Sequence, residues 1–161
     1  MAALGGCTEG GRPEASVPPA QAGETISISV GPCFGFCPVY TASIEPDGTV
    51  VFNGERHTAL LGEKQRKLTP ATYRDVAREL APFCPATGAS ESVACDSTIS
   101  DTSTFTISWT AGDGTKTVAT LQRGCSGGPG KDLDRVLQTL PQQLKIEAWS
   151  KQITRPGVSR G

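Results

Sequence analysis

Two cysteines that lie four residues apart are the first residues in this sequence that could do chemistry. Cys33 and Cys37 occur in the stretch 31–40, with Gly35 midway between them. Four residues of extended strand span about 13 Å, whereas bridged cysteines have Cα atoms no more than about 7 Å apart. A tight loop brings such a pair together, and Gly35 can adopt the positive φ that the loop needs. We therefore expect a Cys33–Cys37 disulfide.

The same two thiols also suit a soft metal ion or a redox dithiol. The spacing C-x-x-x-C-P resembles the copper-binding loop of the Sco-type copper chaperones, in which the loop opens a helix and a distal His completes the site. By that resemblance, His57 would join Cys33 and Cys37 as a third ligand. The residues 39–44 that follow are β-branched or alternate in polarity, which predicts a strand instead of a helix. Copper-type metal handling or thiol redox chemistry is therefore the alternative to a structural disulfide.

The other cysteines allow at least one further bridge. A hairpin centred on Asp113-Gly114 aligns residue 105 roughly with residue 122, and Cys95 and Cys125 both lie just beyond its joined ends. We therefore expect a Cys95–Cys125 disulfide. If Cys7 is modified, three thiols form one bridge and leave one over, and the pairing state of Cys84 stays open.

Two sequence patterns suggest catalysis, and neither is complete. The stretch 124–129 is similar to the Gly-Asp-Ser-Gly-Gly-Pro of trypsin-like proteases, with Ser126 as nucleophile, but Cys125 occupies the Asp position. The chain is also too short for the two β-barrels of that family. Read as a phosphate-binding loop, the stretch has Cys125 in place of the first Gly and Asp132 in place of Ser or Thr. We assign no catalytic residue and no cofactor.

Composition favours an oxidising compartment. The 161 residues suit one domain and carry a net charge of −1, which gives no general attraction to nucleic acid. Six cysteines accompany 19 glycines and 12 prolines, while aromatic residues make up only 6%. This pattern is typical of secreted or envelope proteins. No apolar run approaches the length of a membrane span.

The N-terminus predicts a lipid anchor. Leu4-Gly5-Gly6-Cys7 resembles a bacterial lipobox, in which the cysteine becomes lipid-modified, although only Met1-Ala2-Ala3 precede it. Residues 8–24 are rich in Gly, Pro, Ala and Glu, as expected of a tether. We expect residues 1–24 to be a truncated signal, lipobox and tether. The protein would then be a periplasm-facing outer-membrane lipoprotein that contacts the membrane through Cys7, because Thr8 stands where an Asp would direct retention in the inner membrane. The alternative is that it is secreted.

Residue periodicity predicts one α+β domain over residues 25–153, followed by a loose tail over 154–161. Alternating apolar residues and turn signals predict strands joined as hairpins in an antiparallel sheet. Thr69-Pro70 predicts a helix start and Pro141 the end of a second helix, with residues 124–130 as a loop. The order is β-β-β-(β)-α-β-β-α-α, with strands near 25–30, 39–45, 49–54, 62–68, 105–109 and 116–122 and helices near 70–80, 133–140 and 146–153.

The order of motifs resembles an uncharacterised family of bacterial envelope proteins, often predicted lipoproteins, that carry a domain of unknown function. The resemblance covers residues 25–150 and is most specific in G-x-C-x-G-x-C-P-x-Y followed by the Asp47-Gly48 hairpin. It implies no activity. We expect a non-enzymatic envelope protein with a binding or structural role and an unknown protein or small-molecule partner. The residues of this signature loop are Gly31, Cys33, Gly35, Cys37, Pro38 and Tyr40.

Overall fold

The alternation in Thr25–Val30 (β1) makes this strand the centre of the sheet. Ile26, Ile28 and Val30 face one side and are buried, while Ser27 and Ser29 face the other. Side chains alternate between the two faces of a strand, so this pattern gives β1 one apolar and one polar face. Its two neighbours, β2 and β6, are both antiparallel to it and repeat the pattern in register. The inner face of the sheet is therefore apolar across its three central strands.

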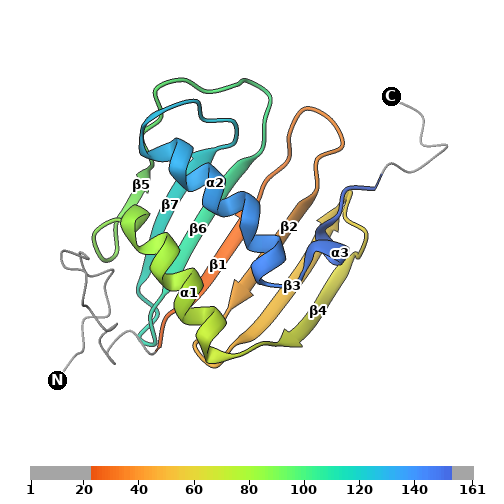
Figure 1. Ribbon diagram of the computed structural model, residues 1–161, viewed down its shortest axis with the longest axis vertical. Helices are drawn as coiled ribbons and strands as arrows, with labels where there is room; N and C mark the ends of the chain where they lie inside the picture. The colour runs from red at the N-terminus through yellow and green to blue at the C-terminus, as the bar shows by residue number, and fades with distance from the viewer. Residues whose placement is uncertain (1–22, 154–161) are drawn as a thin grey trace.

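The computed structural model describes residues 23–153, in which helices lie on one face of a seven-stranded sheet (Figure 1). The strands follow the order β4-β3-β2-β1-β6-β7-β5. None of the described helices combines the length and apolar character needed to cross a membrane. Besides β1, the elements are β2 (Val39–Ile44), β3 (Thr49–Arg56), β4 (Gly62–Lys67), α1 (Pro70–Leu80), η2 (Ala81–Phe83), β5 (Ser90–Ser92), β6 (Thr104–Thr110), β7 (Lys116–Gln122), α2 (Gly128–Gln143) and α3 (Glu147–Ser150).

The α+β class is confirmed, with two corrections. The sheet is mixed, because β5 pairs with β7 in parallel after the chain has crossed over through α1. The second helix begins at Gly128, inside the predicted loop 124–130, and continues through Pro141 to Gln143. Pro141 has no N–H to donate to the preceding turn. The chain stays helical after it, and the amide of Leu144 donates to the carbonyl of Leu140. The predicted segments 1–22 and 154–161 lie outside the described residues.

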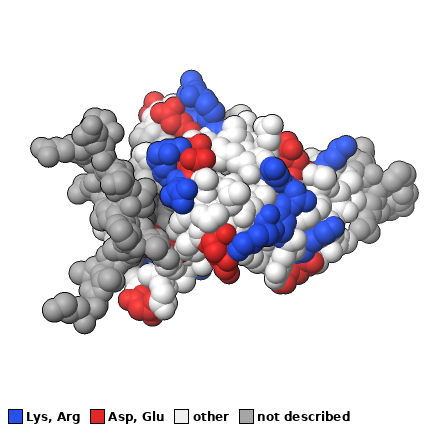
Figure 2. Space-filling view, turned by 60° about the horizontal axis from the view of Figure 1, so that its bottom comes forward, with Lys and Arg blue, Asp and Glu red and all other residues white. Residues whose placement is uncertain are grey.

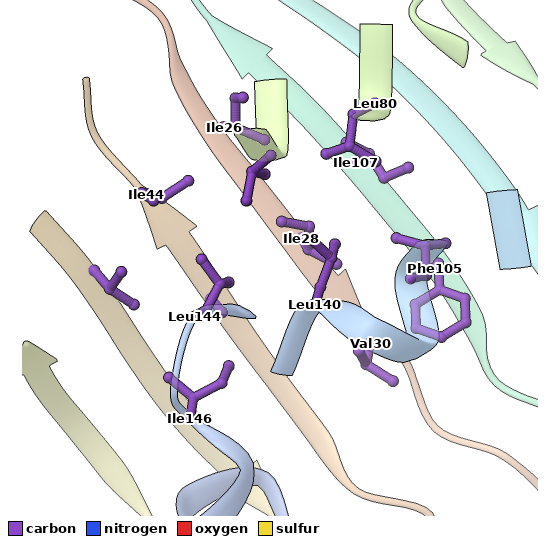
Figure 3. Packing of buried hydrophobic residues seen from close by; sticks show 14 of the residues in the cluster. Ile26, Ile28, Val30, Ile44, Leu80, Phe105, Ile107, Leu140, Leu144 and Ile146 are labelled. Carbon is purple, nitrogen blue, oxygen red and sulfur yellow. The ribbon is translucent and has the colours of Figure 1, made fainter. Parts of the chain in front are cut away.

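Two amphipathic helices cover the inner face of the sheet. Thr69 caps α1, because its side-chain oxygen accepts from the amide of Thr72, and Pro70 occupies the first turn. Figure 3 shows Leu80 of α1 beside Ile107, and Leu140 of α2 over Ile28. The core is continuous through the sheet and the helices. Its helical members are Tyr73, Val76, Leu80, Leu133, Leu137 and Leu140, and Leu144, Ile146 and Trp149 extend it toward β3 and β4.

A hydrogen bond from Tyr73 holds the start of β1 against α1. Its hydroxyl donates to the backbone carbonyl of Glu24 at 2.7 Å, and both residues are buried. Burial, with a smaller contribution from the Glu24 carboxylate, raises the pKa of Tyr73 to about 12. The tyrosine therefore keeps the proton that it donates, and the chain enters the sheet at a fixed point.

Gly54 allows the β3–β4 loop to pack closely against the sheet. A Cβ atom at this position would overlap the carbonyl oxygen of Leu60 and lie 2.6 Å from Oγ1 of Thr58. Thr58 is fully buried, and its hydroxyl donates to the same Leu60 carbonyl at 2.7 Å. The loop therefore occupies the space that a side chain at residue 54 would need.

We expect Gly54→Ala to lower the free energy of unfolding by about 1–3 kcal/mol, because the buried Thr58–Leu60 turn must shift. Gly112→Ala is the matched control, since a Cβ atom there meets nothing within 4 Å. It should change stability by no more than about 0.5 kcal/mol. Urea unfolding of the two variants measures both values. Equal effects would contradict the close approach at Gly54.

Candidate functional site

Four loops meet at one end of the sheet. Val30 at the end of β1 lies opposite both Tyr40 of β2 and Phe105 of β6, so the loops that adjoin these residues are neighbours. The ends of β3, β5 and β7 lie at the same end by their pairing. We call this region the loop end, and it lies toward the top of Figure 1. It comprises loops 31–38, 57–61, 93–103 and 123–127.

The loop end carries the exposed large apolar side chains of the described residues. They are Phe34 at 90%, Ile99 at 62%, Leu61 at 50% and Phe36 at 38% exposure. The four residues come from three separate loops. Single exposed apolar residues are common on proteins, whereas several at one end make the loop end the candidate contact surface of this fold.

The signature loop holds its two phenylalanines in a fixed conformation. Cys33 and Cys37 are joined by a disulfide with a Cα–Cα distance of 5.7 Å. Gly35 has a φ of 145°, which favours glycine. The amide of Phe34 donates to the Asp101 carbonyl at 3.1 Å, and that of Gly35 donates to the Cys33 carbonyl at 3.0 Å. Covalent and hydrogen bonds therefore tie the loop apex to its base and to the neighbouring loop.

The base of the signature loop belongs to the core. The Tyr40 ring packs against Phe52 at 5.3 Å between centroids. Burial raises the pKa of Tyr40, while Arg123 and a hydrogen bond with Ser150 act in the opposite direction. The side chain is thus neutral and links β2 to α3. Tyr40 positions the loop, whereas Phe34 and Phe36 face solvent.

His57 lies beside Phe36 rather than completing a metal site. The two rings meet edge to face with centroids 5.2 Å apart, and His57 has a φ of 59°. The sulfurs of Cys33 and Cys37 are bonded to each other, which leaves no thiolate to bind a metal. Within residues 23–153, no group of three or more His, Cys, Asp or Glu side chains is arranged to hold a metal ion. Nothing in this geometry supports the copper-type alternative.

A second disulfide fastens the opposite side of the loop end. Cys95 and Cys125 are bonded with a Cα–Cα distance of 5.8 Å, which joins the loop before β6 to the loop after β7. This is the pair expected from the hairpin geometry. Cys84 is disulfide-bonded as well, so the count that left one thiol over does not hold. Cys7, the predicted lipidation site, lies outside the described residues.

The Gly-rich stretch before α2 has a packing role. A Cβ atom at Gly127 would overlap the Asp96 carboxylate, and one at Gly130 would lie 2.8 Å from the sulfur of Cys125. The glycines therefore let the segment that contains Asp96 approach the N-terminus of α2, where a negative charge is stabilising. Asp96 is thus explained as a helix-terminal carboxylate.

Ser126 has the contacts of a loop residue. Its hydroxyl donates to the Ser97 carbonyl at 3.3 Å, and its amide donates to the same carbonyl at 2.9 Å. No hydrogen bond from Ser126 to a histidine or carboxylate occurs in the described part of the chain. The Gly-Cys-Ser-Gly-Gly-Pro pattern is therefore accounted for by a tight connection into α2.

We expect the Cys95–Cys125 bridge to contribute more to stability than Cys33–Cys37, because it closes a longer loop. The sequence separations are 30 and 4. Chain entropy then gives about 3.7 kcal/mol for the longer bridge and about 2 kcal/mol for the shorter. Denaturant unfolding of the two double Cys→Ala variants measures each loss.

Peptide mapping of the oxidised chain checks the pairing itself. Peptides containing Cys95 and Cys125 should be joined until reductant is added. A peptide that joins Cys84 to Cys95 would contradict this assignment, and so would a larger stability loss from the 33–37 pair.

Comparison with known proteins places the fold in a family. Residues 24–144 match a family described as a domain of unknown function, DUF6438. The match runs from the residue before β1 to the residue after α2, and α3 lies beyond it. No curated protein matches the chain. Because the match covers well over half of its residues, the protein belongs to the DUF6438 family.

Proposed function

We propose that this protein is a non-enzymatic domain of the bacterial envelope that presents its loop end to a partner. The observation that carries the proposal is the position of its disulfides. The bridges 33–37 and 95–125 both lie at the loop end, together with Phe34, Phe36 and Ile99. Covalent bonds therefore fix the part of the fold that exposes apolar side chains.

An extracytoplasmic location agrees with this chemistry. Disulfides persist in oxidising compartments and are rare where thiols are kept reduced. Cys33 is only partly buried. The accessible 33–37 bridge would be reduced in the cytosol, and the loop would then lose the constraint that fixes Phe34. An oxidising compartment would keep the surface in its binding conformation.

The direction of the chain also supports presentation of the loop end. β1 starts at Thr25 and ends at Val30, directly before the signature loop. An anchor that precedes Thr25 therefore joins the domain at the end opposite to the loops (Figure 1). An anchored domain would keep its apolar loops accessible to a partner in the envelope.

Expression of the gene with its own upstream region, followed by cell fractionation, tests the location and the Cys7 anchor predicted from the sequence. We expect the protein outside the cytosol. An acylated Cys7 would place it in the membrane fraction, because several acyl chains on one cysteine hold a protein firmly, and Cys7→Ala would release it.

Recovery in the soluble fraction without any effect of Cys7→Ala would rule the anchor out. A mapped peptide that joins Cys7 to Cys84 would also contradict it, since an acylated sulfur cannot form a disulfide.

A further inference from the structure

We propose that the loop end is a bilayer-contacting surface and that Phe34 and Phe36 insert into the interface of a phospholipid membrane. This names the partner of the loop end, and it rests on the proposed extracytoplasmic function only in requiring that a membrane is within reach. Three features of this end of the domain support it: the positions of the exposed apolar side chains, the lack of charge in the signature loop and the bonds that fix that loop.

The exposed apolar side chains are spread over one end of the domain. Phe34, Leu61 and Ile99 belong to three separate loops, yet all three loops leave the sheet at the same end. A bilayer can contact side chains from all of these loops together. Phe and Leu side chains are among those with which peripheral protein segments enter the headgroup boundary of a membrane.

The signature loop contains no charged side chain that would be costly to move into a membrane interface. No charged residue occurs from Gly31 to Ile44. An unsatisfied backbone amide is strongly unfavourable in lipid, but the amides of Phe34 and Gly35 at the apex already donate to carbonyls of this chain. The apex can therefore leave water without losing these hydrogen bonds.

Rigidity lowers the entropic cost of insertion. The 33–37 disulfide and the hydrogen bond from Phe34 to Asp101 fix the loop before it meets a partner. A contact surface that is already in its bound conformation loses little freedom on binding. Phe34 is 90% exposed in this conformation, so its ring is available for contact without rearrangement of the loop.

Charge around the loop end distinguishes this contact from electrostatic membrane binding. Arg56 and Arg123 are exposed there, and the exposed Glu55, Asp96 and Asp101 more than balance them. The opposite end carries charges in its turns, such as the Asp47–Lys67 ion pair, and Figure 2 shows basic and acidic side chains interspersed where that end comes forward. The apolar groups therefore supply the attraction, and we expect little dependence on anionic lipid.

Flotation with lipid vesicles tests the inference on the full oxidised chain, produced without acylation. One vesicle set contains phosphatidylethanolamine and phosphatidylglycerol, and a second contains phosphatidylcholine alone. We expect the protein to float with both. The double variant Phe34→Ala, Phe36→Ala should bind at least about tenfold more weakly, because two aromatic side chains no longer enter the interface. Val51→Ala, which shortens a half-buried apolar side chain on the open face of β3, should bind as the wild type does.

A tryptophan probe locates the contact. Trp109 and Trp149 are buried, so a tryptophan introduced at residue 34 reports on the loop. Phe34→Trp should shift its emission to shorter wavelength when vesicles are added. Thr139→Trp on the exposed side of α2 is the matched control and should not shift.

Three results would overturn the inference. They are a wild-type protein that floats with neither vesicle set, alanine variants that bind as tightly as the wild type, and equal emission shifts at residues 34 and 139. Unchanged near-ultraviolet circular dichroism shows that each variant is folded. Membrane recovery through Cys7 without vesicle binding would remove this inference and leave the proposed function intact. Vesicle binding by a protein that fractionates in the cytosol would contradict the proposed function and leave this inference intact.

Discussion

The burial of one sheet face against two helices is the interaction on which the rest of the structure depends. β1 sets it, because Ile28 lies opposite Ala42 on one side and Ile107 on the other, and all three are buried. Since the side-chain period of a strand is two, a register that buries these residues turns the intervening serines and threonines outward. The loops add to this core at their bases, where Thr58 and Cys125 are buried. Their exposed residues, such as Phe34 and Ile99, take no part in it and are available for contact.

The residues of the signature loop and of the hairpin that follows it also fall into two groups, those that the fold needs and those that are exposed. Gly35 and Gly48 have positive φ values, and a Cβ atom at Gly48 or Gly54 would collide with the chain. Tyr40 packs on the core. These residues are explained by backbone conformation and close packing. Phe34 and Phe36 lie inside the same motif but outside the core: Phe34 is 90% exposed, and Phe36 is 38% exposed with its ring against His57. This contrast is what directs attention to a binding function for the loop.

Local signals in the sequence predicted most of the framework. The Pro46-Asp47-Gly48 turn between alternating strands identifies the β2–β3 hairpin, and Thr69-Pro70 identifies the start of α1. β5 was missed because Ser90–Ser92 has no apolar residue. Only backbone hydrogen bonds beside β7, such as Val118 to Ala89, mark it as a strand. The early start of α2 was missed because its glycines are needed for close contacts, and the Asp96 side chain that Gly127 meets is distant in sequence. For the same reason, no local pattern could bring Leu61 and Ile99 to the end that carries Phe34.

Amide hydrogen exchange of the oxidised protein, with and without phospholipid vesicles, tests most directly whether the loop end is the contact surface. The account predicts slower exchange in loops 31–38, 57–61 and 93–103 when vesicles are present. It predicts no change in the turns at residues 45–48 and 111–115, which lie at the opposite end of the sheet. Protection confined to those turns or to the open face of the sheet, or no protection at all, would contradict it.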